Sequence, residues 1–122
     1  MSEDIFDAII VGAGVAGSVA ALVLAREGAQ VLVIERGNSA GAKNVTGGRI
    51  YAHSLERIIP GFAGHAPVER LITHEKLSFM TDKGAMTVDY LNGDHGEPEQ
   101  ASYSVLRSKF DAWLMEQAEE AG

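Results

Sequence analysis

The sequence predicts an α/β fold in which a helix joins two parallel strands, and three features near its start carry this prediction. Residues 8–11, AIIV, are apolar without alternation, which is typical of a parallel strand buried on both faces. A stretch rich in Ala, Val and Leu then reaches Arg26 and is ended by Gly28, as expected of a helix with a glycine C-cap. Residues 30–35, QVLVIE, are again short and apolar. Strand, helix and strand form a βαβ unit over residues 1–37, with an expected right-handed crossover.

Three glycines, Gly12, Gly14 and Gly17, lie between the first strand and the helix with the spacing G-x-G-x-x-G. In a Rossmann-like unit the first permits the tight turn, the second lets a pyrophosphate approach the backbone, and the third lets helix and strand pack closely. Unpaired N–H groups at the helix start, where Val15 and Ala16 lie, stabilise a diphosphate without a lysine. The motif therefore predicts dinucleotide binding, with a glycine-rich structural turn as the alternative.

An acidic residue closes the second strand. Glu35 follows Gly14 at close to the interval of roughly 20 residues at which an acid accepts hydrogen bonds from a ribose hydroxyl. An acid in this position, followed by Arg36, disfavours a ligand with a 2′-phosphate. The motif alone leaves both FAD and NAD open.

A glycine-rich loop is predicted over residues 41–51, GAKNVTGGRIY. Gly47 and Gly48 lack a Cβ and so allow the backbone to approach a flat cofactor ring, with Lys43 nearby. A flexible surface turn explains the same composition equally well. The loop is therefore a candidate cofactor contact on composition alone.

The middle of the chain is expected to be structural. Residues 54–59 predict a short helix stopped by Pro60 and Gly61. Alternation over residues 72–91, with a bend at 82–84, predicts an inserted antiparallel β-hairpin. No residue here is a catalytic candidate.

The last segment, residues 102–122, predicts a strand at 102–106 and a helix to Ala121 that Ser108 caps. Arg107 lies at the strand end, where cofactor contact and an ordinary surface ion pair are equally favoured. Apolar side chains recur on one helix face and are assigned to the core: Phe110, Trp113, Leu114 and Ala118. A helix followed by glycine should lead into another parallel strand, so we expect a fragment of a longer protein.

The composition of the chain argues against several classes of function. The net charge of −7 and the pI of about 5.0 argue against a nucleic-acid partner. The absence of cysteine excludes disulfides, thiolate metal sites and a cysteine nucleophile. The four histidines lack metal-ligand spacing, so no metal site is predicted, and the catalytic residues are unknown. An acidic start and no transmembrane segment predict a cytoplasmic protein, with peripheral contact at the inner face of the membrane left open.

Three stretches, residues 7–37, 41–62 and 102–122, together resemble the N-terminal part of FixC-type flavoproteins. These are relatives of electron-transfer-flavoprotein:quinone oxidoreductase and, more distantly, of geranylgeranyl reductases. The resemblance covers essentially the whole chain and implies FAD. By that likeness the three glycines hold the pyrophosphate, Glu35 the adenosine ribose, the loop from Lys43 to Gly48 approaches the flavin, and Arg107 reaches the phosphate-ribose region.

The same resemblance implies an activity. Family members pass electrons from an electron-transfer flavoprotein to a quinone or a reductase, with a small ferredoxin-like partner. We therefore expect residues 1–122 to be the N-terminal part of the FAD-binding domain of such an oxidoreductase. The alternatives are an isoprenoid (geranylgeranyl) reductase, a flavin monooxygenase, and a non-catalytic nucleotide-binding fragment.

Overall fold

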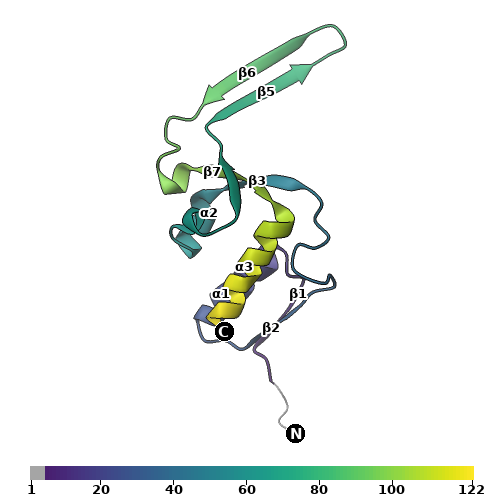
Figure 1. Ribbon diagram of the computed structural model, residues 1–122, viewed down its shortest axis with the longest axis vertical. Coiled ribbons are helices and arrows are strands. Elements are labelled where there is room, and N and C mark those ends of the chain that lie inside the picture. The colour runs from purple at the N-terminus through teal and green to yellow at the C-terminus, as the bar shows by residue number, and fades with distance from the viewer. Residues whose placement is uncertain (1–4) are drawn as a thin grey trace.

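The computed structural model describes residues 5–122 (Figure 1). Residues 1–4, which include the acidic Glu3 and Asp4 used in the argument against a secretory signal, lie outside them. The elements are β1 (Ala8–Val11), α1 (Val15–Arg26), β2 (Val31–Ile34), β3 (Gly47–Tyr51), α2 (Ala52–Ile58), the 3₁₀ turn η1 (Phe62–Gly64), β4 (Val68–Leu71), β5 (His74–Met80), β6 (Ala85–Leu91), the 3₁₀ turn η2 (Pro98–Gln100), β7 (Ser102–Leu106) and α3 (Arg107–Ala121). The structure is therefore a mixed α/β fold, as predicted.

The predicted βαβ unit is present as β1, α1 and β2. The two strands pair in parallel, from Ala8 opposite Val31 to Val11 opposite Ile34. Burial on both faces of β1 was wrong for the described residues, because Ile9 is 61% exposed and Val11 83% exposed. The strand pair is covered by α1 on one face only, so alternate side chains of β1 remain in solvent.

A three-stranded antiparallel sheet, with the order β3-β7-β4, is the main departure from the prediction. Residues 47–51 are strand β3 and not part of a loop, because their backbone pairs with β7 from Gly47 opposite Leu106 to Tyr51 opposite Ser102. β7 therefore belongs to an antiparallel sheet, so the rule for the carboxyl edge of parallel strands does not apply to Arg107. β4 was not predicted.

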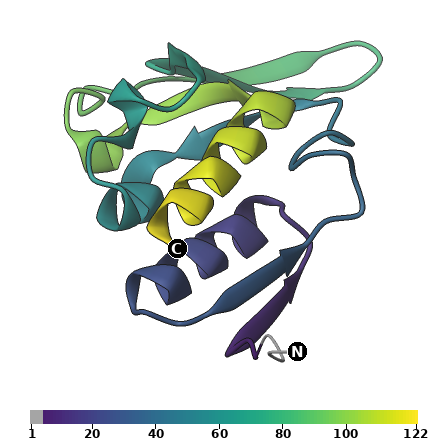
Figure 2. The same ribbon diagram turned by 60° about the horizontal axis from the view of Figure 1, so that its bottom comes forward.

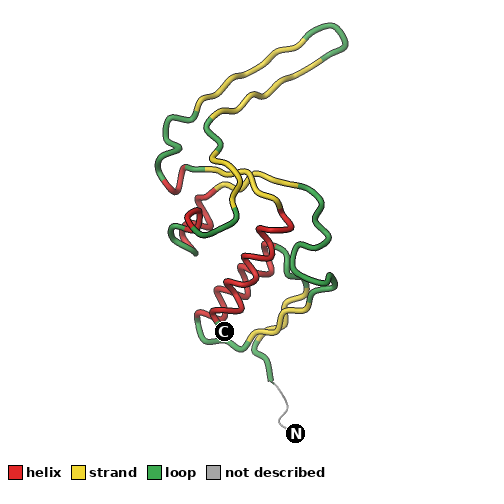
Figure 3. The backbone as a smooth tube through the Cα atoms, in the orientation of Figure 1, coloured by secondary structure: helices red, strands yellow, loops and turns green. Residues whose placement is uncertain are grey.

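The predicted hairpin is formed by β5 and β6, which pair from His74 opposite Leu91 to Met80 opposite Ala85. Its turn is closed by the Thr81 N–H, which donates to the Gly84 carbonyl at 2.8 Å. The hairpin extends away from the helices, as the tube in Figure 3 shows. It therefore lies apart from the glycine-rich turn.

The core lies between the helices and the antiparallel sheet. Figure 2 shows α1 beside α3, with the β1–β2 pair on one side and the antiparallel sheet on the other. Phe110, Leu114 and Ala118 of α3 are buried, as predicted. α3 begins at Arg107 without a side-chain cap, so the expected cap by Ser108 was wrong. Arg107 is thus the first residue of the helix, which turns its side chain toward residues one helical turn ahead.

Candidate FAD-binding site

Two of the three glycines are required by the fold itself. Gly12 has φ +104°, which side chains of L-residues rarely adopt, and its N–H donates to the Ile34 carbonyl at 2.7 Å. A Cβ on Gly17 would lie 2.0 Å from the carbonyl oxygen of Gly12 and 3.2 Å from the Ile10 side chain. The turn after β1 and the close packing of α1 on it therefore need glycine at both positions.

Gly14 differs, because nothing in the described chain requires a glycine there. Its backbone is extended (φ −77°, ψ −179°), and a Cβ built on it would meet no heavy atom within 4 Å. The first helical hydrogen bond of α1 runs from the Ser18 N–H to the Gly14 carbonyl at 2.9 Å. The N–H groups of Val15, Ala16 and Gly17 therefore have no partner within the helix and border this open space.

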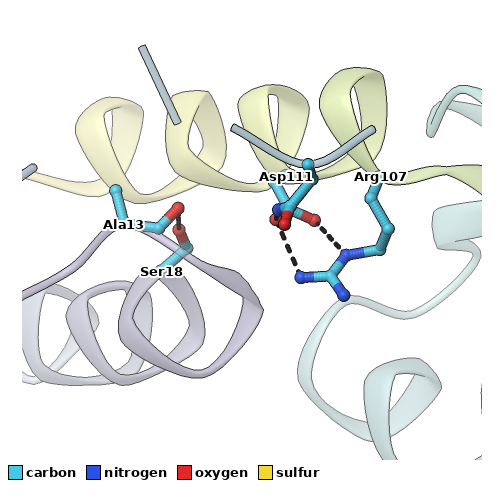
Figure 4. Close-up of polar contacts among 5 residues, drawn as sticks. Ala13, Ser18, Arg107 and Asp111 are labelled. Carbon is cyan, nitrogen blue, oxygen red and sulfur yellow. Dashed lines mark hydrogen bonds and ion pairs between the residues drawn. The ribbon is translucent and has the colours of Figure 1, made fainter. Parts of the chain in front are cut away.

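A buried serine holds the turn against α3. The Ser18 side chain is fully buried, and its hydroxyl donates to the Ala13 carbonyl at 3.4 Å (Figure 4). The hydroxyl also lies 3.7 Å from the Met115 sulfur. These contacts fix the position of the peptide immediately before Gly14. The turn before α1 is thus connected to α3 through Ser18.

Glu35 reaches back from the end of β2 to the same turn. Its carboxylate accepts hydrogen bonds from the Ala13 N–H at 2.9 Å and from the Gly37 N–H at 2.5 Å. These bonds, first that of Gly37 and then that of Ala13, lower the pKa of the Glu35 carboxyl below its ordinary value of 4.5. A carboxylate has about four acceptor sites. It can therefore hold the turn and still accept hydrogen bonds from ribose hydroxyls.

The structure brings together three of the sequence-predicted residues around one cavity. A cavity of about 260 Å³ is lined by Val15 of α1, Gly48 of β3 and Arg107 of α3. The other lining residues are Arg49, Ile50, Val105 and Phe110. Residues distant in sequence thus meet beside the start of α1.

The remaining predicted residues lie outside that lining. Lys43 and Arg36 are exposed, and Lys43 acts on Glu35 only as a nearby positive charge. Gly47 faces the sheet, where a Cβ would lie 3.0 Å from the Val105 carbonyl oxygen. The structure accounts for Gly47 by strand packing. Assignment of these three residues to cofactor binding stays a prediction, as it does for the other residues singled out in the sequence.

Sequence reasoning missed Asp111 and Asn44. Arg107 donates from Nε to Asp111 Oδ1 at 2.8 Å and from Nη2 to Oδ2 at 2.9 Å, and Asn44 Nδ2 donates to Oδ2 at 2.7 Å. The hydrogen bond with Asp111 raises the pKa of Arg107. Arg107 is therefore not in an ordinary surface ion pair, because Asp111 is completely buried. The i, i+4 spacing on the helix was the signal that could have found this pair.

Arg49 was also passed over, although it lines the same cavity. It forms a two-pronged ion pair with Glu75 of β5, with nitrogen–oxygen distances of 2.6 Å, and Nε donates to the Ser102 hydroxyl at 3.0 Å. Its guanidinium lies 4.4 Å from the centre of the Tyr51 ring. Arg49 thus ties the hairpin to the antiparallel sheet.

The site can bind an anion, but it offers little acid–base chemistry. Its positive groups are backbone N–H groups and the guanidinium groups of Arg49 and Arg107. Its carboxylate, Glu35, already accepts hydrogen bonds from two N–H groups. Within residues 5–122, no group of three or more His, Asp or Glu side chains is arranged to hold a metal ion. The arrangement fits a dinucleotide, since the space at Gly14 is open and the N–H groups at the start of α1 have no partner within the helix.

The model of the FAD dependent oxidoreductase family matches residues 7–121, so the chain belongs to that family. This membership confirms FAD as the cofactor, which the glycine motif had left open between FAD and NAD. Over all 122 residues the chain is 88% identical to the protein FixC of Escherichia coli strain K12. It is 66% identical to YdiS of the same strain, a probable electron transfer flavoprotein-quinone oxidoreductase. The resemblance to FixC-type proteins is thereby confirmed, and the chain spans 28% of the length of each relative.

Solved structures agree with this fold. A geranylgeranyl bacteriochlorophyll reductase-like protein from Thermoplasma acidophilum matches 96% of this chain and 28% of its own, with a TM-score of 0.71 and 23% identity. Aklavinone-11 hydroxylase, solved with FAD and aklavinone, matches 100% of this chain and 25% of its own, with a TM-score of 0.66 and 20% identity. At these identities the likeness concerns the fold alone.

Proposed function

We propose that residues 7–107 of this chain supply the dinucleotide-holding half of the FAD site. The diphosphate lies against the N–H groups of Val15, Ala16 and Gly17, and Glu35 accepts hydrogen bonds from the adenosine ribose. Arg107 and the strand backbone at Gly48 contact the cofactor from the other side of the cavity. The open space at Gly14 carries this proposal, because it is the one glycine of the motif with no structural reason to be a glycine.

Bound FAD supplies the redox chemistry, by accepting and releasing electrons. The residues of this chain bind and orient the cofactor. The helix origin neutralises the diphosphate by its N–H groups. Ser18 holds the Ala13 carbonyl in the turn just before them, which reduces the ordering that binding requires. No described side chain is assigned a proton-transfer role.

We further propose that the whole protein transfers electrons from an electron-transfer flavoprotein to a quinone or a reductase. The support is the 66% identity to YdiS, together with the 48% identity to YgcN, which carries the same description. A small ferredoxin-like protein is the proposed further partner. The isoprenoid reductase and monooxygenase alternatives have only fold likeness in their favour.

We also propose that the protein works in the cytoplasm, with contact at the inner face of the membrane when the acceptor is a quinone. In residues 5–122, no helix is both long and apolar enough to cross a bilayer. Fractionation of cells into soluble and membrane parts, followed by detection of the protein, tests this location. Exclusive recovery from a periplasmic fraction would contradict it.

The test of function uses a full-length protein that contains this 122-residue region. We expect it to purify with bound flavin, which bleaches when reduced electron-transfer flavoprotein is added without oxygen. A soluble quinone analogue should then restore the oxidised spectrum. Bound flavin that ignores the electron-transfer flavoprotein, but is reduced by a nicotinamide cofactor, would contradict the electron-transfer proposal and leave the binding proposal intact.

A further inference from the structure

A buried carboxylate, that of Asp111, lies one helical turn after Arg107 on α3. Asp111 has no exposed surface, yet it receives three hydrogen bonds: two from Arg107 and one from Asn44. Burial of a charge is costly unless it is paired and hydrogen-bonded, so all three donors are needed to keep it there. Figure 4 shows the Arg107 guanidinium lying edge-on against this carboxylate. Asp111 is thus the shared acceptor of a group of three residues, Asn44, Arg107 and Asp111.

The same carboxylate fixes the loop between β2 and β3. Gly41 has φ +75°, and a Cβ on it would lie 2.8 Å from the Cβ of Asp111 and 2.9 Å from the Arg107 carbonyl oxygen. The Arg107 N–H donates to the Thr46 carbonyl at 3.3 Å. Asn44, in the middle of this loop, supplies the third hydrogen bond to Asp111. The second half of the loop therefore contacts α3 at three points: Gly41, Asn44 and Thr46.

The Arg107 guanidinium contacts the buried Asp111 carboxylate through one edge, and the Arg107 side chain also borders the cavity. The ion pair uses Nε and Nη2, which leaves Nη1 outside it. The Arg107 side chain is 36% exposed and borders the cavity, whereas Asp111 is fully buried and is not among the lining residues. Any influence of Asp111 on a bound cofactor must therefore pass through Arg107 or through the loop.

We propose that Asp111 is a positioning residue for FAD: it orients Arg107 toward the cavity and, with Asn44, holds the loop of residues 41–46 in place. This inference rests on the proposed FAD site. An arginine has several flexible torsions, and a bidentate carboxylate partner restricts them, so less conformational entropy is lost when a phosphate or ribose is bound. The pair thus preorganises Arg107, whereas Arg49, the other arginine that lines the cavity, is held separately by Glu75.

The experiment measures FAD dissociation constants by flavin fluorescence in a full-length protein that contains this region, after removal of the native flavin. Asp111→Asn keeps the shape but removes the charge that orients Arg107, and we expect FAD to bind about tenfold more weakly. Leu114→Ala is the matched control, because Leu114 is equally buried on the same helix and lies outside the group. We expect it to lower the melting temperature while leaving the dissociation constant within about twofold of the parent.

A double-mutant cycle separates positioning from general destabilisation. Because Asp111 acts partly through Arg107 and partly through the loop, Arg107→Ala combined with Asp111→Asn should weaken FAD binding by less than the two single losses added together. Full additivity of the two losses would overturn the inference, and so would an unchanged dissociation constant for Asp111→Asn. If Asp111→Asn does not fold, Asn44→Ala removes one hydrogen bond and keeps the ion pair. It should weaken FAD about threefold, and an unchanged value would overturn the inference.

Failure of the proposed function has a different signature. A parent protein that does not bind FAD would refute the site as a whole. A parent that binds FAD normally, with variants of Asp111 and Asn44 that bind it equally well, would refute only the positioning role.

Discussion

The two glycines at the start of α1 should respond in opposite ways to the same substitution. In Gly14→Ala the new Cβ meets no heavy atom within 4 Å, and the extended backbone suits any residue. Loss of a glycine N-cap lowers the free energy of unfolding by a few tenths of a kcal/mol or more. The reduced entropy of the unfolded chain raises it by about 0.4–1 kcal/mol. The free energy of unfolding of the apoprotein should therefore change by less than about 0.5 kcal/mol.

FAD binding should nevertheless suffer, because that methyl group occupies the space proposed for the diphosphate. Forcing an extra carbon into a filled site costs about 1–3 kcal/mol. This corresponds to a dissociation constant for FAD that is roughly 5- to 150-fold higher. Gly14→Val should abolish FAD retention during purification, since its side chain is larger.

Gly17→Ala should show the reverse order of effects. Its Cβ would lie 2.0 Å from the Gly12 carbonyl oxygen, so α1 must shift away from the turn. The better helix propensity of alanine offers about 1 kcal/mol, which does not offset an overlap this severe. We expect the apoprotein to lose roughly 1–2 kcal/mol of unfolding free energy.

The assay is thermal and denaturant unfolding of the flavin-free protein, together with a fluorescence titration with FAD, on the parent and both variants. Gly14→Ala with parental stability and weakened FAD binding supports the phosphate position. FAD binding by Gly14→Ala that equals the parent would refute it. A Gly17→Ala variant as stable as the parent would refute the close packing of helix and turn.

The remaining predictions concern the acid, the hairpin anchor and the core. Glu35→Ala should weaken FAD roughly tenfold, because a hydrogen bond to a charged group is lost; identical titration curves would refute the ribose role. The folded pKa of Glu35 is lowered, so its stabilising contribution is complete above the ordinary 4.5 and is lost as the pH falls through the lowered value. Unfolding curves of the parent and Glu35→Gln should therefore converge at acidic pH, and a constant difference would contradict this. Arg49→Ala should release the hairpin and speed its cleavage by a protease, and a cleavage rate equal to that of the parent would contradict this. Leu114→Ala should cost about 2–5 kcal/mol of unfolding free energy, measured with urea, since Leu114 is fully buried.

Features encoded over short distances in the sequence were predictable. The turn between β1 and α1 follows from the glycine spacing, since Gly12 needs a positive φ and Gly17 a missing Cβ. The hairpin follows from alternation and the bend before Gly84. In each case the residues that make the contact lie within one or two neighbouring elements.

Features that depend on distant pairing were not predictable. Gly47 and Gly48 have no strand signal of their own, and they become part of β3 because β7, far along the chain, offers a backbone to pair with. The group around Asp111 depends on a hydrogen bond between Asn44 in a loop and Asp111 on α3, two residues that are 67 positions apart in the sequence. Its buried carboxylate looked like an ordinary polar helix residue until the fold placed it beneath Gly41.

The most direct measurement is a crystal structure of a full-length protein containing this region with FAD bound. The proposed site predicts diphosphate oxygens about 2.7–3.2 Å from the backbone nitrogens at the start of α1, next to Gly14. A diphosphate bound elsewhere, with a side chain or another segment filling the space at Gly14, would contradict the proposal that this helix origin holds the cofactor.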